Sequence, residues 1–188
     1  MSERNDPWRT SSSQLEGELE RYHPESFGWA MHCCDRDPDE AGDVLQAVYL
    51  KVLSGRARYG GRSSFRTWLF GVIRVTSAER RRKRVRRTAA LRRLWNDRIS
   101  GVTNPGRVPD PHQEVERSER SVRLLEALGR LPDRQRETLH LVFYQGLTIE
   151  EASEVMGVAL GTARTHYERG KKSLRRLLDD EGKGWVDG

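Results

Sequence analysis

The chain has 188 residues, of which 35% are hydrophobic and 33% charged, with a formal net charge of +6. Its mean hydropathy of −0.81 is low, so the material suffices for one or two small cores and excludes one large core. No apolar run is long enough to span a membrane, and the N-terminus lacks the apolar centre of a secretion signal. We therefore expect a cytoplasmic protein without membrane insertion.

The first third of the chain predicts two helical segments behind a polar tail. From Leu19 to Cys34 a helical pattern is interrupted at His23-Pro24, where proline breaks or restarts a helix. A further helix is expected from Asp39 to Leu53, because apolar residues recur at steps of three and four. Its stripe consists of Ala41, Val44, Leu45, Val48 and Leu53. The adjacent Cys33 and Cys34 lack the spacing of a metal site or a structural disulfide, so we expect half-buried helix residues.

The middle of the chain concentrates the positive charge. After a glycine-containing loop at 55–64, a long helix is expected from Phe65 to about Leu94, apolar in its first half and arginine-rich in its second. Between Arg62 and Arg98 there are 13 Lys and Arg against 2 Asp and Glu, a local charge of +11. The block RRRKRVRR at 80–87 would repel itself unless a polyanion lies near, which favours a helix that faces nucleic acid.

The C-terminal half predicts a second helical domain. Ser100–Gln113 is rich in Pro and Gly and has no period, which is typical of a linker. Two apolar stripes follow, one of Val122, Leu125 and Leu128 and one of Leu139, Val142 and Phe143. Pro132 is well placed to open the second of these helices. No strand alternation is present, so the predicted fold is all-α, with two small helical domains joined by a flexible linker.

Residues 146–177 have the layout of a helix-turn-helix. Thr148 is a suitable N-cap, and Glu151 completes a capping box three positions later. Gly157 supplies the turn, because glycine accepts a positive φ without penalty. The second helix has an apolar side, formed by Ala163, Tyr167, Gly170, Leu174 and Leu177, and a polar side, formed by Arg164, Thr165, Glu168, Arg169, Lys171 and Lys172. Such a helix can enter the DNA major groove; an amphipathic hairpin with a solvated basic face is the alternative.

Three segments in a fixed order carry a resemblance to a known family. They are AGDVLQAVYLKVL at 41–53, GGRSSFRTWLFGVIR at 60–74 and LPDRQRETLHLVFYQGLTIEEASEVMGVALGTARTHYERGKKSL at 131–174. The first two resemble the polymerase-binding helix and the promoter-melting segment of sigma region 2, and the third resembles region 4, which reads the −35 element. The chain is thus similar to the extracytoplasmic-function sigma factors, the small two-domain class of bacterial RNA polymerase specificity subunits.

The resemblance implies a domain for each region. Residues 19–98 would form the region 2 domain, residues 119–180 the region 4 domain, and residues 99–118 the linker. Residues 1–18 would be a disordered N-terminal tail and residues 181–188 a C-terminal tail. The chain would bind core RNA polymerase, recognise the −35 and −10 promoter elements and initiate transcription of a specific regulon.

The promoter-melting segment supplies the candidates for single-strand binding. Aromatic faces stack on unpaired bases, and cations follow the backbone. By resemblance this segment captures the non-template strand of the −10 element; its candidates are Arg62, Ser63, Ser64, Phe65, Trp68 and Arg74. Trp68 also fits a core position, at helical spacing with Val72, and Phe65 fits either role. Val75 replaces the asparagine that the family usually has, so the loop before Phe65 is expected to carry more of the −10 specificity.

The remaining candidates follow from the other two segments. On the second helix of region 4 the DNA-binding candidates are Thr162, Arg164, Thr165, His166, Arg169 and Lys172. Asp43 and Gln46 share a helix face and by resemblance contact the clamp helices of the largest polymerase subunit. The resemblance adds the polymerase flap as a partner, and an anti-sigma factor as a further candidate.

Two other functions stay open at this point. A stand-alone helix-turn-helix regulator would bind its operator as a symmetric dimer without polymerase. A helical adaptor would use its basic segment to dock an acidic protein or RNA. The chain has no P-loop, nucleophile elbow or HExxH motif, so no enzyme, cofactor or metal site is expected.

Overall fold

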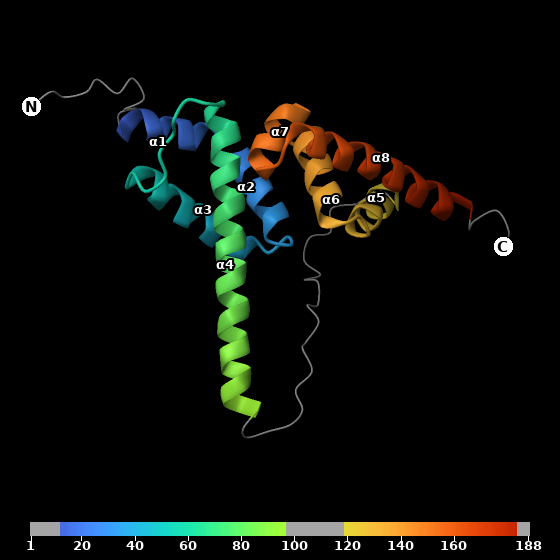
Figure 1. Ribbon diagram of the computed structural model, residues 1–188, viewed down its shortest axis with the longest axis horizontal. Helices are drawn as coiled ribbons and strands as arrows, with labels where there is room; N and C mark the ends of the chain where they lie inside the picture. The colour runs from blue at the N-terminus through green and yellow to red at the C-terminus, as the bar shows by residue number, and fades with distance from the viewer. Residues whose placement is uncertain (1–11, 97–118, 184–188) are drawn as a thin grey trace, which may run out of the picture.

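The computed structural model describes residues 12–96 and 119–183, and within them the regular structure is entirely helical (Figure 1). One helical unit is built from each range, which confirms the predicted all-α fold with two helical regions. Most of the predicted linker and of the two tails lies outside the described residues.

The N-terminal unit consists of α1 (Ser12–Arg21), α2 (His23–Cys33), α3 (Pro38–Leu53) and α4 (Phe65–Asn96). The expected interruption at His23-Pro24 is present, because α2 starts there with proline in its first turn. The start of α1 is a correction, since residues 12–18 are helical where the sequence suggests a disordered tail. Leu19 is buried, and Leu15, four residues earlier on the same face, also packs against the core.

Buried apolar side chains join these helices. Trp29 of α2 is fully buried, and its Nε1 donates a hydrogen bond to the backbone oxygen of Phe70 in α4 at 3.0 Å. The buried stripe of α3 consists of Ala41, Val44, Leu45, Val48 and Val52. Leu53, which the sequence places in this stripe, is instead 44% exposed. One residue advances a helix by about 100°, and that step carries Leu53 off the face that ends with Val52.

The C-terminal unit consists of α5 (Glu119–Gly129), α6 (Asp133–Leu139), the π-helix η1 (His140–Tyr144), α7 (Ile149–Met156) and α8 (Leu160–Lys183). The capping box of α7 is present, with Thr148 accepting from the backbone N–H of Glu151 and the Glu151 carboxylate accepting in return. Gly157 has a φ of 63°, which ends α7 and turns the chain into α8. These two local predictions are therefore confirmed.

The π-helix is the feature that the sequence did not predict. The backbone N–H of Gln145 donates to the oxygen of His140, five residues earlier, at 3.0 Å. This wider turn rotates the residues that follow around the helix axis. As a result Leu141 is fully buried, whereas Phe143, expected in the apolar stripe, is 64% exposed and stacks on Tyr167.

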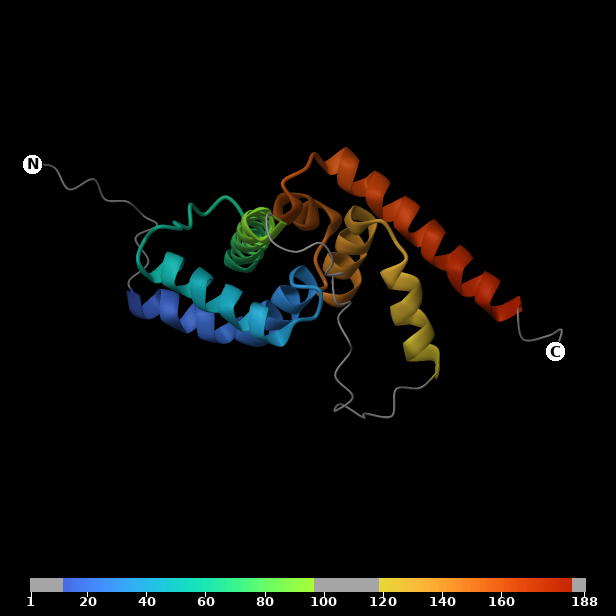
Figure 2. The same cartoon turned by 90° about the horizontal axis from the view of Figure 1, so that it is seen from below.

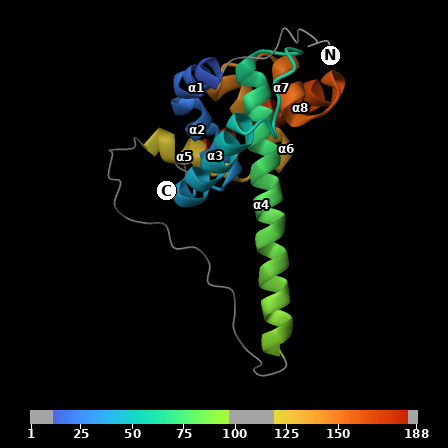
Figure 3. The same ribbon diagram turned by 90° about the vertical axis from the view of Figure 1, so that its left-hand side faces the viewer.

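The two units pack against each other. Figure 2 shows α7 beside the first half of α4, and the buried cluster includes Leu69 and Phe70 together with Val155 and Met156 of α7. The second half of α4 extends beyond both units, as Figures 1 and 3 show. In this extension residues 81–89 are exposed without exception, and six of them are arginine or lysine. The predicted arginine-rich half of the long helix is thus an exposed basic surface, from which Arg84 pairs with Glu40 of α3 at 3.4 Å.

Candidate nucleic-acid interface

Three aromatic side chains support the loop before α4. Phe65 and Trp68 lie on the first turn of α4, with ring centroids 5.3 Å apart. Tyr59 of the loop contacts both rings, at 5.5 and 5.4 Å. Its hydroxyl donates to the backbone oxygen of Ser63 at 2.5 Å, which fixes the loop over the rings. Phe65 and Trp68 are partly buried against the core, so each has both a packing face and an accessible face. Tyr59 could not be identified from the sequence, because an isolated loop residue has no periodicity.

The polar candidates of this loop have different roles. Arg62 is exposed, and Ser63 lines the cleft between α4 and α7. Ser64 is exposed but caps α4, since its Oγ accepts a hydrogen bond from the backbone N–H of Thr67 at 3.1 Å. Its hydroxyl also lies 2.8 Å from the hydroxyl of Thr67. Arg62 is therefore the most accessible cation of the group, whereas the hydroxyl of Ser64 is engaged within the chain.

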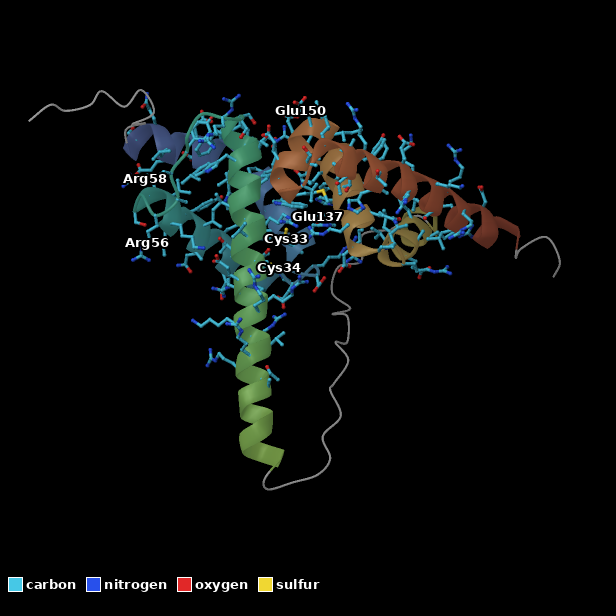
Figure 4. All side chains as sticks on the ribbon, viewed as in Figure 1. Cys33, Cys34, Arg56, Arg58, Glu137 and Glu150 are labelled. Carbon is cyan, nitrogen blue, oxygen red and sulfur yellow. The ribbon has the colours of Figure 1, made fainter. Side chains whose placement is uncertain are left out.

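The cationic candidate of α4 is paired with the other unit. Arg74 forms an ion pair with Glu137 of α6, whose second carboxylate oxygen accepts from Arg134 at 3.0 Å. Burial raises the pKa of Glu137, and the guanidinium of Arg74 acts in the opposite direction. Figure 4 shows Glu137 beside Cys33 where the two units meet. Arg74 is therefore not free to bind a phosphate in this conformation.

A cleft of about 540 Å³ separates α4 from α7. Its walls include Ser63, Trp68, Arg74 and Val75 from the N-terminal unit and Glu154, Val155 and Gly157 from the C-terminal unit. Val75, where the family usually has asparagine, is 50% exposed. Next to it, Lys51 bonds both Thr76 and Glu79, at 3.0 and 2.8 Å. One aromatic candidate, Trp68, and one cationic candidate, Arg74, thus line the same cleft, with the acidic Glu154 on the opposite wall.

The polar side of α8 faces solvent. Thr162, Arg164, Thr165, Arg169 and Lys172 are exposed, and His166 is partly buried. Thr165 donates its hydroxyl to the backbone oxygen of Gly161 at 2.9 Å, so only its remaining acceptor capacity is open. On the opposite side Gly170 is buried, and a Cβ there would lie 3.2 Å from the side chain of Leu139. Glycine thus permits close packing of α8 on α6, which explains its place in the apolar side.

A second surface lies on α3. Asp43 and Gln46 are exposed, and Asp43 forms an ion pair with Arg80 at 2.6 Å. Leu50 and Leu53 continue the same helical stripe and are 63% and 44% exposed. Two exposed leucines in line with two polar residues form a mixed contact surface. The sequence pointed to the polar pair only, because the rule that apolar residues are buried assigned Leu53 to the core.

The remaining candidates add no chemistry. Burial raises the pKa of Cys34 to about 11 and raises that of Cys33 further, so both thiols are protonated and unreactive at neutral pH. Among the described residues no group of His, Cys, Asp and Glu is arranged to hold a metal ion. In the same part of the chain, no helix is long and apolar enough to cross a membrane.

Comparison with known proteins identifies the regions. Residues 19–87 match the family model described as Sigma-70 region 2, and residues 121–174 match that described as Sigma-70, region 4. The chain is 28% identical over 171 residues to the ECF RNA polymerase sigma factor SigX of Bacillus subtilis (strain 168), covering 85% of each protein. It is 32% identical over 142 residues to the RNA polymerase sigma factor CarQ of Myxococcus xanthus, covering 74% of this chain and 75% of CarQ.

The fold is similar to that of a solved complex, the sigma factor RpoE with the anti-sigma factor NepR from Bartonella quintana. The TM-score is 0.64 at 23% identity, and the match covers 94% of this chain and 99% of the other.

Proposed function

The chain belongs to the extracytoplasmic-function class of RNA polymerase sigma factors, and from this premise we propose which of its surfaces contact the promoter and the polymerase. Members of the class direct RNA polymerase to promoters and are not enzymes. The proposed domains are region 2 at residues 19–98 and region 4 at residues 119–180, with residues 99–118 as the linker. The cytoplasm, where RNA polymerase works, is the proposed location.

Region 4 binds the −35 element through α8. The observation that carries this assignment is the exposed polar side of α8, presented as the second helix of a capped helix-turn-helix. Arg164 and Arg169 are candidates for base edges or phosphates, because Arg can bond guanine bidentately or neutralise a phosphate. Thr162, Thr165, His166 and Lys172 complete the contact surface.

Region 2 holds the melted −10 strand on the surface formed by the loop at 55–64 and the first turns of α4. Phe65 and Trp68 offer ring faces for stacking, and Arg62 and Arg74 offer cations for the backbone. Tyr59 positions both rings through its contacts and its hydrogen bond to the loop. Ser63 and Ser64 lie on the same loop, directly before α4. With Val75 in place of asparagine, base selection depends on the loop more than on α4.

Core polymerase contacts the stripe on α3. Asp43 and Gln46 supply polar contacts, and the exposed Leu50 and Leu53 supply apolar area beside them. The clamp helices of the largest subunit are the proposed partner of this stripe, and the flap that of region 4. The solved relative is a complex with an anti-sigma factor, and we extend that class of partner to this chain as well.

Run-off transcription with sigma-free core polymerase tests the assignment. Genomic fragments would first locate promoters that depend on the added chain. The variant R164A/R169A should then lose at least about tenfold of run-off product, since each specific contact is worth about 1–3 kcal/mol. The matched control is R175A/R176A, which removes the same charge from exposed positions further along α8. Equal loss in both variants would contradict the assignment of the contacts to the start of α8.

A stand-alone helix-turn-helix regulator, which the sequence alone left open, differs from a sigma factor in not depending on polymerase. It is separated from a sigma factor by a gel shift without polymerase. Tight, sequence-specific binding of the purified chain to duplex DNA would favour the regulator. Binding that depends on added core polymerase supports the sigma factor, because two weak contacts become strong only when both are tethered.

A further inference from the structure

Region 4 covers the face of region 2 to which we assign the promoter strand. Glu137 of α6 pairs with Arg74, and the backbone oxygen of Gln145 accepts from Arg66. Thr67 donates to the carboxylate of Glu151 at 3.5 Å. These contacts join residues 63 to 84 positions apart in the chain. We call this contact surface between α2 and α4 on one side and α6, η1 and α7 on the other the junction.

Two histidines stack at the centre of the junction. His32 of α2 and His140 of η1 have ring centroids 4.1 Å apart, at an interplanar angle of 26°. Trp29 flanks both rings, at 5.2 and 5.5 Å, and Tyr144 stacks on His140 at 4.9 Å. Each unit supplies one histidine, so the stack exists only while the two units are together.

A hydrogen bond at the stack suits a neutral ring. The side-chain amide nitrogen of Gln145, itself buried, lies 3.2 Å from Nε2 of His140. With the amide nitrogen facing the ring, this contact suits the neutral tautomer of His140 that carries its proton on Nδ1. A second positive ring at 4.1 Å would in addition repel the first. The geometry of the junction therefore selects uncharged histidines on both sides.

The surroundings act in the same direction. Burial, together with the guanidinium groups of Arg136 and Arg36, lowers the pKa of His32 to about 4. Burial lowers the pKa of His140 to about 3, with His32 and Arg36 adding to the effect.

The carboxylates near the stack are not placed to stabilise a positive charge on His32 or His140. Asp133 pairs with Arg136 at 2.9 Å, and Glu137 pairs with both Arg134 and Arg74. Asp35 lines the same cleft as His32 but lies on the exposed turn after α2. A proton on either ring would thus find arginines and an aromatic stack, not a free anion.

We propose that this arrangement is a closed resting form of the chain, stable only while His32 and His140 are uncharged, and that their protonation releases region 4 and uncovers the promoter face of region 2. That this face of region 2 binds the promoter rests on the proposed function; the closed form and its response to protons do not. Acidification would then favour the open form, which alone can place both units on one polymerase.

The size of the effect follows from linkage. A histidine whose pKa is lowered in the closed form stabilises closure fully above its ordinary value of ~6.5 and progressively less as pH falls below it. From pH 7.5 to pH 6.0 each ring shifts the equilibrium toward the open form by roughly fourfold, so the pair shifts it by about 14-fold. If the closed form dominates, apparent affinity for a partner that binds only the open form rises by the same factor.

Two measurements on the full chain test the proposal. Ring proton resonances should show both histidines titrating at least about one pH unit below ~6.5. For each protein, affinity for core polymerase is measured at pH 7.5 and at pH 6.0. The ratio of the two affinities should be about 14-fold larger in the wild type and in H23Q than in the variant H32Q/H140Q. His23 is exposed on the far part of α2 and serves as the matched control.

The pH-dependent closure and the proposed function are contradicted by different outcomes. The proposal is overturned if the two rings titrate near ~6.5, or if H32Q/H140Q retains the full pH dependence of the wild type. It is also overturned if the rings titrate low but the wild-type affinity does not change with pH. Failure to bind core polymerase at any pH would contradict the proposed function instead, and the ring titration would still decide whether closure excludes protons.

Discussion

The ion pair between Arg74 and Glu137 leads to an asymmetric prediction for its two single variants. The side chains are 22% and 14% exposed, so the carboxylate is the more deeply placed partner. Burial raises the pKa of Glu137 even though Arg74 opposes the shift. The charge on Glu137 thus costs stability at neutral pH, and Arg74 offsets part of that cost.

R74Q and E137Q should therefore lower the free energy of unfolding by different amounts. R74Q leaves a buried carboxylate with only Arg134, and we expect it to lower the free energy of unfolding by about 1–3 kcal/mol at pH 7.5. E137Q removes the buried charge and leaves an arginine that can reach water, so its cost should stay below about 1 kcal/mol. The double variant R74Q/E137Q should resemble E137Q, because the carboxylate that needs Arg74 is gone.

The pH dependence of R74Q has a definite sign. An acid whose pKa is raised in the folded state contributes stability below its ordinary pKa, and this contribution is lost as pH rises through the raised value. The cost of R74Q should therefore be small near pH 4 and grow as pH rises toward neutral. Urea unfolding followed by circular dichroism at several pH values measures this. A larger cost for E137Q than for R74Q at pH 7.5 would refute the reasoning.

Other predictions concern the turn, the cap and the polymerase surface. G157A should lower the free energy of unfolding in urea by about 1 kcal/mol, because Gly157 has a φ of 63°. G161A should raise it by up to about 1 kcal/mol, because an added methyl group in the first turn of α8 would meet open space. T148A should cost about 1 kcal/mol by loss of the capping box; no change would show that Glu151 caps α7 alone. L50E and L53E should leave unfolding within about 0.5 kcal/mol but weaken core polymerase binding in a titration; unchanged affinity would remove α3 from that interface.

Local features of the fold were predictable because their causes are local. The capping box at Thr148 and Glu151 needs two residue types at one spacing, and the turn at Gly157 needs one glycine. The restart of the chain at His23-Pro24 likewise follows from the chemistry of proline. Each of these depends on residues within one helical turn, so the sequence contains the whole cause.

The errors have a different origin. Phe143 is exposed, although it was predicted in the apolar stripe, because a π-turn changes the helical period, and no residue type marks a π-turn in advance. Leu53 is exposed because the buried face of α3 ends with Val52, and the next residue points about 100° away from that face. The helix from Ser12 forms because Leu15 and Leu19 find a core, although the surrounding composition is polar.

Residue types and periodicity indicated the candidate residues, whose roles stay predictions, but not how the structure brings them together. Periodicity and residue type indicated the aromatic loop and the polar side of α8, and the structure places these residues on accessible surfaces. The stack of His32 on His140 joins residues 108 positions apart in the chain, and nothing in either local segment refers to the other. An interpretation as two tethered domains therefore misses the contact between the two units.

Charge explains why the same face of region 2 can have two alternative partners. A surface that binds a nucleic-acid strand must present cations and donors, and these groups remain when the strand is absent. In the closed form region 4 supplies carboxylates to that surface, since Glu137 pairs with Arg74 and Glu151 accepts from Thr67. Glu154 lines the same cleft. In the proposed closed form these carboxylates compete with phosphates for the same groups, so strand binding and closure would exclude each other, and a condition that weakens closure would strengthen promoter binding.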